Sequence, residues 1–372
     1  MSELATDNAF ATISPRHLAW VRFKRHRLAL VSGWFLLLIY FVAALCEFMT
    51  PYGTDTRNVQ AINAPPMSVN FVDNEGRFHL RPFVYGYDMH INDDTWMREY
   101  SENPQKRYPI YFLTGGERYK FWNLFSADIH LFSTGEDGYI HLFGTDQLGR
   151  DVFSRVFYGA RVSLSIGVVG VLLTLFLGVL LGGLAGYIGG LVDRVVQRVI
   201  EVLQSLPTLP LWMALSAALP VSWSSLRVYF GITIILSLFG WPALARQVRG
   251  KFLALREEDF VMSARLLGAG KMRVIFRHML PSFNSHIIAT ATLAVPGMIL
   301  GETALSFLGI GLRPPVVSWG VLMQQAQNYQ VIVLTPWLLI PGLFVVLTVM
   351  AFNLLGDGLR DALDPYSTGG QN

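Results

Sequence analysis

The chain has 372 residues, of which 52% are hydrophobic and only 15% are charged, and its mean hydropathy is +0.40. Soluble proteins carry about 25% charged residues, so this composition excludes an ordinary soluble protein and predicts a membrane protein. The net charge of +3 does not indicate nucleic-acid binding, and the single cysteine, Cys46, excludes an intrachain disulfide.

Six apolar stretches are each long enough to cross a bilayer, which requires about 20 mainly apolar residues. They predict an all-α polytopic membrane protein with six transmembrane helices. In chain order the stretches cover residues 28–46, 162–192, 202–226, 228–245, 284–301 and 335–355.

The distribution of Lys and Arg predicts the topology. Residues 1–27 carry five and residues 246–281 carry eight, whereas residues 219–227 and 303–334 carry one each. Because an excess of Lys and Arg marks the cytoplasmic side, we expect both termini and the 246–281 segment in the cytoplasm. The first apolar run is too long for a signal-peptide core, so we expect an uncleaved helix.

A long exported region follows the first span. Residues 71–80 and 109–122 each show a strand–turn–strand pattern, the second around Gly115 and Gly116. We expect a small β-rich domain outside the membrane, whose aromatic residues are more readily explained as core than as a ligand site. Its histidines lack metal-ligand spacing, so we expect no metal site.

The second span carries Gly178, Gly182, Gly186 and Gly190, one glycine every four residues. This spacing predicts a groove along one helix face and the close approach of another helix. A phosphate-binding glycine loop is excluded because no strand precedes these glycines.

Four polar or helix-breaking positions in the later spans are candidates for the transport pathway. Pro207 and Pro210 predict a kink or a break in the third span, and broken helices often border translocation paths. Glu201 opens the third span and Glu302 lies late in the fifth. Charges inside a membrane tend to be functional, although both carboxylates could also lie near an interface, and kinks that only serve packing are equally common.

The segment 259–281 is basic and amphipathic. Its first apolar stripe consists of Phe260, Ala264 and Leu267, and its second of Met272, Ile275, Phe276 and Met279. We expect Gly268 and Gly270 to separate two short helices and Pro281 to end the second. Two such helices at a membrane surface predict docking to another protein.

The sequence carries no recognisable enzyme signature. Gly268–Lys271 is similar to the end of a phosphate loop, but Arg265 stands where that motif needs a glycine and Met272 where it needs Ser or Thr. The serine-hydrolase and zinc-protease patterns are also missing. We therefore expect no enzyme activity and no cofactor bound by this chain.

The same segment resembles the EAA loop of binding-protein-dependent ABC importer permeases, E-A-A-x-x-x-G followed by a hydrophobic stretch that ends in L-P. The matching positions are Met262, Ser263, Ala264, Gly268, His278, Leu280 and Pro281. Met262 and Ser263 replace the glutamate and the first alanine. Phe260, Leu267 and Arg273 complete the expected ATPase-coupling set.

Further blocks resemble the second permease type of dipeptide and oligopeptide importers. They are GTDQLGRDVFSR at 144–155, YGARVSL at 158–164, LSFLG at 305–309, SWG at 318–320 and FNLLGDGLRD at 352–361. The resemblance is loose over 16–48 and close over 142–366.

The resemblance implies the type I ABC importer permease fold in a bacterial inner membrane, as half of a heterodimeric pore. Its implied partners are a homologous permease subunit, two ABC ATPase subunits that use ATP-Mg, and a periplasmic substrate-binding protein. The implied division of the chain is a cytoplasmic tail (1–27), a first transmembrane helix (28–48), a periplasmic insertion (49–142), a permease domain (143–366) with the coupling loop 246–281, and a C-terminal tail (367–372).

Peptides are the default substrates. Oligosaccharides such as α-galactosides, opines and nickel are alternatives within the same importer type. An ATP-independent channel or a structural membrane subunit is a different class of function. It explains six spans but not the amphipathic loop.

Overall fold

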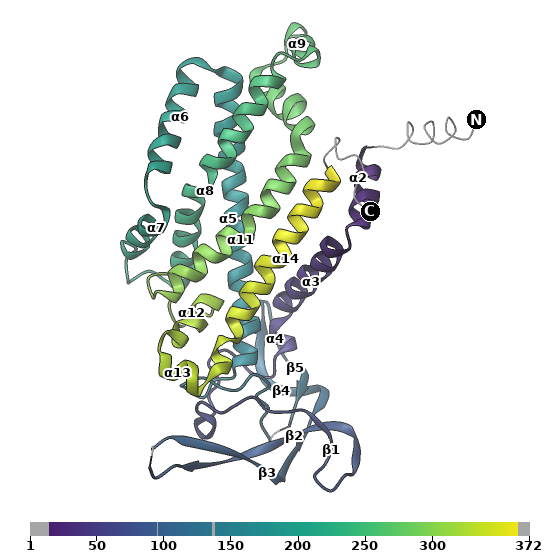
Figure 1. Cartoon of the computed structure of the whole chain (residues 1–372), viewed down its shortest axis with the longest axis vertical. Coiled ribbons are helices and arrows are strands. Elements are labelled where there is room, and N and C mark those ends of the chain that lie inside the picture. Colours follow the sequence, from purple (N-terminus) through teal and green to yellow (C-terminus); the bar gives the residue numbers. More distant parts are fainter. Residues whose placement is uncertain (1–14, 95, 136–137, 364–372) are drawn as a thin grey trace, which may run out of the picture.

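The computed structural model describes residues 15–94, 96–135 and 138–363 as a bundle of tilted helices with a β-rich part at one end (Figure 1). The helices are α2 (Pro15–Arg25), α3 (Arg27–Ala44), α4 (Cys46–Met49), α5 (Val152–Ile188), α6 (Gly190–Ser205), α7 (Thr208–Ala217), α8 (Ser225–Leu255), α9 (Asp259–Leu266), α10 (Lys271–Arg273), α11 (Asn284–Phe307), α12 (Trp319–Met323), α13 (Tyr329–Leu334) and α14 (Ile340–Leu363). The strands are β1 (Asn70–Val72), β2 (Phe78–Ile91), β3 (Arg98–Pro109), β4 (Tyr111–Phe121) and β5 (Phe125–Ser133).

Five helical runs of the described residues are long and apolar enough to cross a membrane, and the bent pair α6–α7 makes a sixth if it counts as one span. The five runs are Arg27–Ala44, Val152–Ile188, Ser225–Leu255, Lys271–Phe307 and Pro336–Leu363. This agrees with the prediction of a helical membrane protein with six spans. The bundle core lies between α3, α5, α8, α11 and α14 and is formed by side chains such as Leu36, Leu164, Ile232, Ile299 and Phe352.

The third span differs from its prediction because residues 202–226 are not one helix. The helices α6 and α7 meet at an angle of 89°. Leu206 and Pro207 are both extended there, as expected for a proline, which lacks an N–H, and for the residue before it. Pro207 therefore makes the predicted break. Pro210 does not, because it lies in the first turn of α7, where backbone N–H groups have no partner within the helix.

Three glycines in the second half of α5 face α8. A Cβ atom on Gly178, Gly182 or Gly186 would collide with Leu244, Ala245 or Arg249 of α8, respectively. Because Ala245 and Arg249 would be met at their backbone, α8 could not approach this closely if side chains were present. Gly190 departs from the predicted row: α5 ends at Ile188, and Gly190 has a φ of +60° with open space around it.

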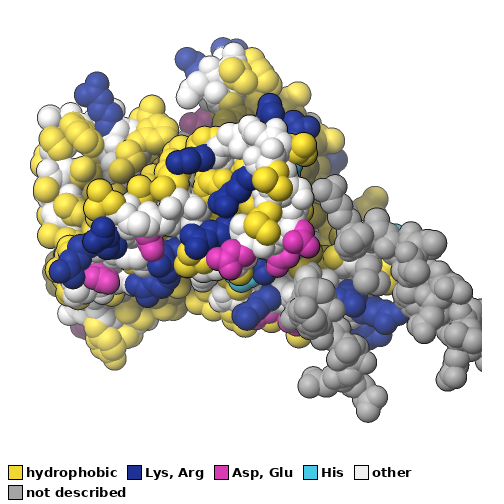
Figure 2. All heavy atoms as spheres, turned by 90° about the horizontal axis from the view of Figure 1, so that it is seen from above, with side chains coloured by type: hydrophobic (Ala, Val, Ile, Leu, Met, Phe, Trp, Pro, Cys, Tyr) yellow, Lys and Arg dark blue, Asp and Glu magenta, His cyan; other side chains and the backbone are white. Residues whose placement is uncertain are grey.

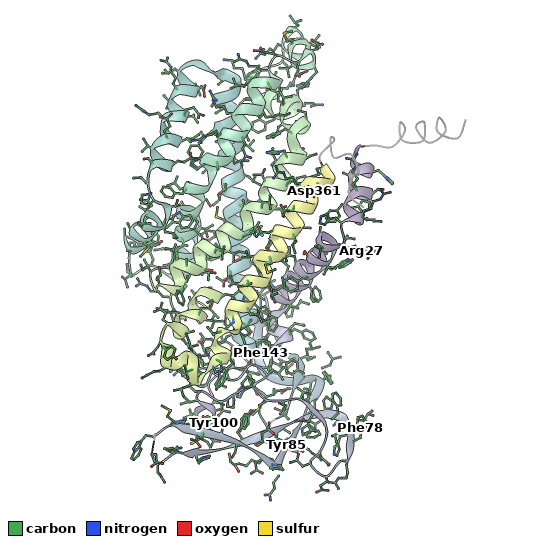
Figure 3. All side chains as sticks on the ribbon, viewed as in Figure 1. Arg27, Phe78, Tyr85, Tyr100, Phe143 and Asp361 are labelled. Carbon is green, nitrogen blue, oxygen red and sulfur yellow. The ribbon has the colours of Figure 1, made fainter. Side chains whose placement is uncertain are left out.

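The β-rich part contains an antiparallel three-stranded sheet, β1–β2–β3, and an antiparallel pair, β4–β5. Its core is formed by Met67, Val84, Ile110 and Ile140, with Tyr52, Tyr87, Tyr108 and Tyr139 packed around them. Figure 3 shows Phe78, Tyr85 and Tyr100 in this part of the molecule, whereas Arg27 of α3 and Asp361 of α14 lie away from it in the bundle.

The hairpin predicted at 71–80 is present, since β1 and β2 flank a turn at 73–77. The hairpin predicted at 109–122 is wrong. Strand β4 runs through Gly115 and Gly116, where the register with β5 shifts, and a Cβ atom on Gly116 would lie 2.6 Å from His130. The turn is formed instead by Trp122 and Asn123, with φ of 48° and 57°. The glycine pair therefore lies at an irregularity of the β-bulge type within β4 and not in a turn.

Candidate functional site

The segment 246–281 forms a small module at the end of the bundle opposite the β-rich part (Figure 1). Helix α8 continues to Leu255, α9 follows, and the chain then enters a helical run from Lys271 to Phe307. Pro281 does not end a helix as predicted. It stands at the start of a 3-10 turn (Leu280–Phe283), where its missing N–H is tolerated, and α11 begins at Asn284, where the fifth span was predicted to begin.

Gly268 ends α9 in a conformation that favours glycine. Its φ is +79°, and its N–H donates to the Arg265 carbonyl at 2.9 Å while the Ala269 N–H donates to the Ala264 carbonyl at 3.0 Å. These two bonds form a Schellman motif. A Cβ atom at Gly268 would meet nothing within 4 Å, so the backbone conformation and not the available space requires glycine. Gly270 has a φ of −65° and carries no such requirement.

One side of the module packs against its own bundle. Beyond α8, its buried residues are Val261, Ala264, Val274, Ile275 and Met279. All of these except Ala264 belong to one apolar cluster with Tyr187 of α5, with Leu244, Val248 and Phe252 of α8, and with Phe283. Ala264, expected to face a partner, is therefore buried inside this chain. Val261 and Ala264 are three residues apart, so they share the face of α9 that meets the bundle.

The other side of the module is apolar and exposed. Its large exposed residues are Phe260, Met262, Leu266, Leu267, Met272 and Phe276, and Leu266 and Leu267 are each 88% exposed. Both predicted stripes are thus divided between an inner and an outer side. Leu266 was missed by the sequence reasoning, although its spacing of four from Met262 could have indicated it. Ser263, Arg273 and Pro281 are also exposed, and His278 is half-buried.

Two polar contacts attach the module and its neighbours to the bundle. Arg265 donates from Nε to Tyr187 Oη at 3.1 Å, and its guanidinium lies 4.8 Å from the centre of the Tyr187 ring. Arg249 of α8 forms a two-pronged ion pair with Asp193 of α6, with N–O distances of 2.5 and 2.6 Å. Figure 2, which looks onto this end, shows Lys and Arg side chains scattered among apolar ones.

Glu302 is completely buried toward the other end of the bundle. Its carboxylate accepts hydrogen bonds from Ser306 at 2.8 Å, Ser318 at 2.7 Å and Ser163 at 3.1 Å. Each serine oxygen also accepts a backbone N–H, from Leu312, Val321 and Trp319, respectively. The carboxylate is therefore enclosed by hydroxyl donors.

Glu302 explains why two sequence blocks lie together. Ser306 belongs to the block at 305–309, and Ser318 and Trp319 to the block at 318–320. The Trp319 indole is fully buried and donates to the Val156 carbonyl of α5 at 3.0 Å. The carboxylate thus joins α5, α11 and the start of α12, a grouping that no sequence spacing indicates.

The block at 144–155 forms the loop that leads into α5. Asp146 accepts hydrogen bonds from the Leu148 N–H at 2.8 Å, from Arg150 Nε at 2.8 Å and from Arg155. These bonds and the two arginine charges hold the pKa of Asp146 below its usual range although its burial opposes this. Asp151 caps α5 by accepting the Ser154 N–H at 2.7 Å.

The remaining pathway candidates lie apart from Glu302. Glu201 is exposed on α6 and pairs with Arg198 at 3.1 Å. Pro207 and Pro210 are exposed at the α6–α7 bend. The structure therefore places these three residues along the bent pair and Glu302 inside the bundle.

Helices long enough to cross a membrane, with a two-sided amphipathic module at one end, define a membrane protein that exposes an apolar surface outside the bilayer-crossing segments. Residues 178–367 match the family described as "Binding-protein-dependent transport system inner membrane component", and residues 14–66 match the "N-terminal TM domain of oligopeptide transport permease C". The chain belongs to this binding-protein-dependent permease family and has the type I ABC importer permease fold. Neither match includes residues 67–177, which contain all five strands.

Curated relatives of this chain carry peptide-transport names. It is 39% identical to the oligopeptide transport system permease protein OppC of Bacillus subtilis (strain 168), over 60% of this chain and 72% of that one. It is 38% identical to DppC, the dipeptide transport system permease protein of the same strain, over 60% and 68%. It is 41% identical to the glutathione transport system permease protein GsiD of Escherichia coli O1:K1 / APEC, over 62% and 73%.

Among solved structures, the chain is similar to the inward-facing MetNI methionine ABC transporter with a TM-score of 0.42 and 17% identity, over 57% of this chain and 97% of that one. A structural similarity with this TM-score adds no evidence to the family match.

Proposed function

We propose that this chain forms half of the translocation pore of an ATP-driven importer, beside a homologous permease subunit. Two ABC ATPase subunits, which use ATP with Mg²⁺, contact the end that carries α9. A periplasmic binding protein delivers substrate at the opposite end. The excess of Lys and Arg in 1–27 and 246–281 supports an inner-membrane orientation with both termini and α9 in the cytoplasm.

The exposed apolar side of the 246–281 module carries this proposal. A soluble surface with Leu266 and Leu267 almost fully exposed is unfavourable unless another protein covers it. The module is at the same time anchored to the bundle through Val261 and Ile275. Covered on one side and anchored on the other, it can transmit force between a partner and the helices.

The anchoring contacts connect the module to three helices of the bundle. Arg265 holds Tyr187 at the end of α5, Phe252 of α8 lies in the same buried cluster, and the module continues directly into α11. In our proposal, closure of the ATPase dimer around ATP moves the module and rocks these three helices between inward-open and outward-open arrangements. The exposed side of α6–α7, with Glu201, Pro207 and Pro210, is the proposed wall of the pathway.

Peptides are the proposed substrates because the curated relatives are named for oligopeptide, dipeptide and glutathione transport. Binding of labelled peptides and of an α-galactoside to the binding protein encoded with this permease tests the assignment. Binding of the sugar alone would contradict it.

The substitution Leu267→Asp tests whether the exposed side of the module binds the ATPase. A carboxylate at the centre of an apolar contact must be desolvated, so we expect Leu267→Asp to lose the ATPase during purification of the complex. Val221→Asp is the matched control, because Val221 is 85% exposed in a loop at the other end of the bundle. Equal retention of the ATPase by both variants would contradict the proposal.

A further inference from the structure

The tip of the β4–β5 hairpin is an exposed apolar surface that the transport cycle described above does not use. Trp122 and Leu124 lie in the turn and Phe125 opens β5, and they are 50%, 81% and 58% exposed. The turn itself is tightly defined, since Trp122 and Asn123 both adopt a left-handed conformation. The tip is therefore a fixed protrusion.

Contacts with the first membrane helix set the height of this tip. Helix α3 has 18 residues and is thus about 27 Å long, close to the roughly 30 Å hydrocarbon thickness of a bilayer. Its last residue, Ala44, therefore lies at the edge of the hydrocarbon. The Trp122 indole donates to the Ala44 carbonyl at 2.9 Å, and Figure 1 places β4 and β5 beside α4, which follows α3.

Arg161 fixes this arrangement from α5. Its guanidinium lies 4.3 Å from the Trp122 ring centre, and it donates to the Ala43 carbonyl at 3.0 Å and to Glu47 at 2.6 Å. The carbonyls at the end of α3, which have no partner within the helix, are thereby satisfied at the membrane edge. An indole at this depth with a polar N–H contact is typical of the aromatic belt of membrane proteins.

The surroundings of the tip match a lipid surface. Helix α3 exposes large apolar side chains along its length, namely Trp34, Leu37, Leu38 and Phe41. The tip exposes further apolar side chains where Trp122 contacts the end of this helix. Behind the tip, the hairpin has an open pocket of about 400 Å³ whose polar lining includes Arg118, Lys120, Ser126 and Asp128, so that two cations stand against one carboxylate. Apolar side chains at the tip suit the acyl chains of lipids, and the cations behind them suit the phosphate groups of the headgroup layer.

We propose that the β4–β5 tip inserts into the interfacial layer of the bilayer, with Trp122, Leu124 and Phe125 at the acyl boundary and Arg118 and Lys120 toward lipid phosphates. The occupant of this surface is lipid because the tip lies at the level where α3 leaves the hydrocarbon. The insertion holds the β-rich part at a fixed height above the membrane.

Depth-dependent fluorescence quenching of the assembled transporter in vesicles of phosphatidylethanolamine and phosphatidylglycerol tests this proposal. A cysteine replaces Leu124 in a Cys46→Ser background with cysteine-free partner subunits, and it carries an NBD label. Lipids with a spin label near the headgroup are the quenchers. Leu80→Cys is the matched control, since Leu80 is a 91% exposed leucine on β2 of the same β-rich part.

We expect the label at 124 to be quenched at least threefold more strongly than the label at 80, and to resist quenching by aqueous iodide. Phe125→Cys, at the next residue of the tip, is the second label position if Leu124→Cys does not assemble. Equal lipid quenching at 124 and 80, or iodide quenching at 124, would place the tip in water and overturn the proposal. Shielding from both quenchers would show that a partner protein covers the tip, and this also overturns it.

Discussion

The two ends of the helical bundle are held together by different kinds of contact. At the α9 end, the 246–281 module is attached mainly by apolar side chains such as Val261, Ile275 and Met279, with Arg265–Tyr187 as a polar supplement. At the other end, Glu302 and Asp146 each collect several directional hydrogen bonds.

This difference indicates where the molecule can adjust. Apolar contacts are non-directional, so a packed module can shift slightly without losing all its stabilisation. A buried carboxylate surrounded by donors has one favourable geometry, and a displacement leaves donors unsatisfied. We infer that the α9 end yields to a partner, while the Glu302 region keeps α5, α11 and α12 in register.

Replacing Glu302 should have the largest effect because it removes the acceptor of three buried hydroxyls. We expect Glu302→Ala to lose about 3 kcal/mol or more of stability, seen as a large fall in the apparent Tm of the purified complex. Glu302→Gln keeps an oxygen at the position that accepts from Ser306 and Ser318, so its loss should be clearly smaller. Equal Tm values for Glu302→Ala and the unmodified protein would contradict the inference that directional hydrogen bonds hold the Glu302 end together.

Substitutions at the contact between α5 and α8 should have the next largest effect on stability. A Cβ atom on Gly182 would overlap the Ala245 carbonyl, whereas one on Gly183 would meet its nearest neighbour, Ile275, at 3.7 Å. We expect Gly182→Ala to cost about 1–3 kcal/mol and Gly183→Ala to be neutral or slightly stabilising. Apparent Tm and uptake of both variants measure this difference. A destabilised Gly183→Ala would mean that helix packing does not explain the glycine row.

Changing Gly268 should affect coupling more than assembly. A side chain at φ +79° costs about 1–2 kcal/mol locally, so Gly268→Val should unravel the end of α9 while the complex stays in the membrane. We expect ATP hydrolysis to continue without matching uptake. Gly270→Val is the control, since its φ is −65° and its surroundings are also open. Normal uptake by Gly268→Val would show that the module does not transmit force.

The smallest effect concerns the turn between β1 and β2. The hydrogen bond from His79, with those from Arg77 and the backbone, holds the pKa of Asp73 well below its usual range. Its contribution is therefore fully present above the unfolded value of about 3.9 and is lost as the pH falls below that value toward the folded one.

Hydrogen exchange at the Glu75 and Arg77 amides, which donate to Asp73, reports this contribution. Protection should persist at pH 5 in the unmodified protein and should be weaker in Asp73→Asn. Unchanged protection in Asp73→Asn would contradict the role of this carboxylate.

Features that depend on local chemistry were predictable from the sequence. Run lengths of apolar residues predicted the spans apart from the third, the missing N–H of Pro207 predicted the break between α6 and α7, and the start of α11 at Asn284 was predicted directly. The glycine spacing in α5 indicated a close helix contact but not the partner helix or the exclusion of Gly190.

Features that depend on tertiary contacts were not predictable. Helical periodicity shows that a face is apolar but not whether its own chain covers it, so Ala264 was expected to face a partner although this chain buries it. The partners of Glu302 come from three separate elements, and no spacing brings them together. The Gly115–Gly116 pair favoured a turn, but the left-handed conformations of Trp122 and Asn123 place it seven residues later.

The central claim is that the 246–281 module has a bundle-facing side and an ATPase-facing side, and cysteine cross-linking in the assembled complex tests it most directly. In a Cys46→Ser background, Leu267→Cys should cross-link to the ATPase subunit, because Leu267 is 88% exposed. Ala264→Cys, three residues earlier and buried inside this chain, should not. Cross-linking from position 264, or none from 267 while the ATPase remains bound, would contradict the account.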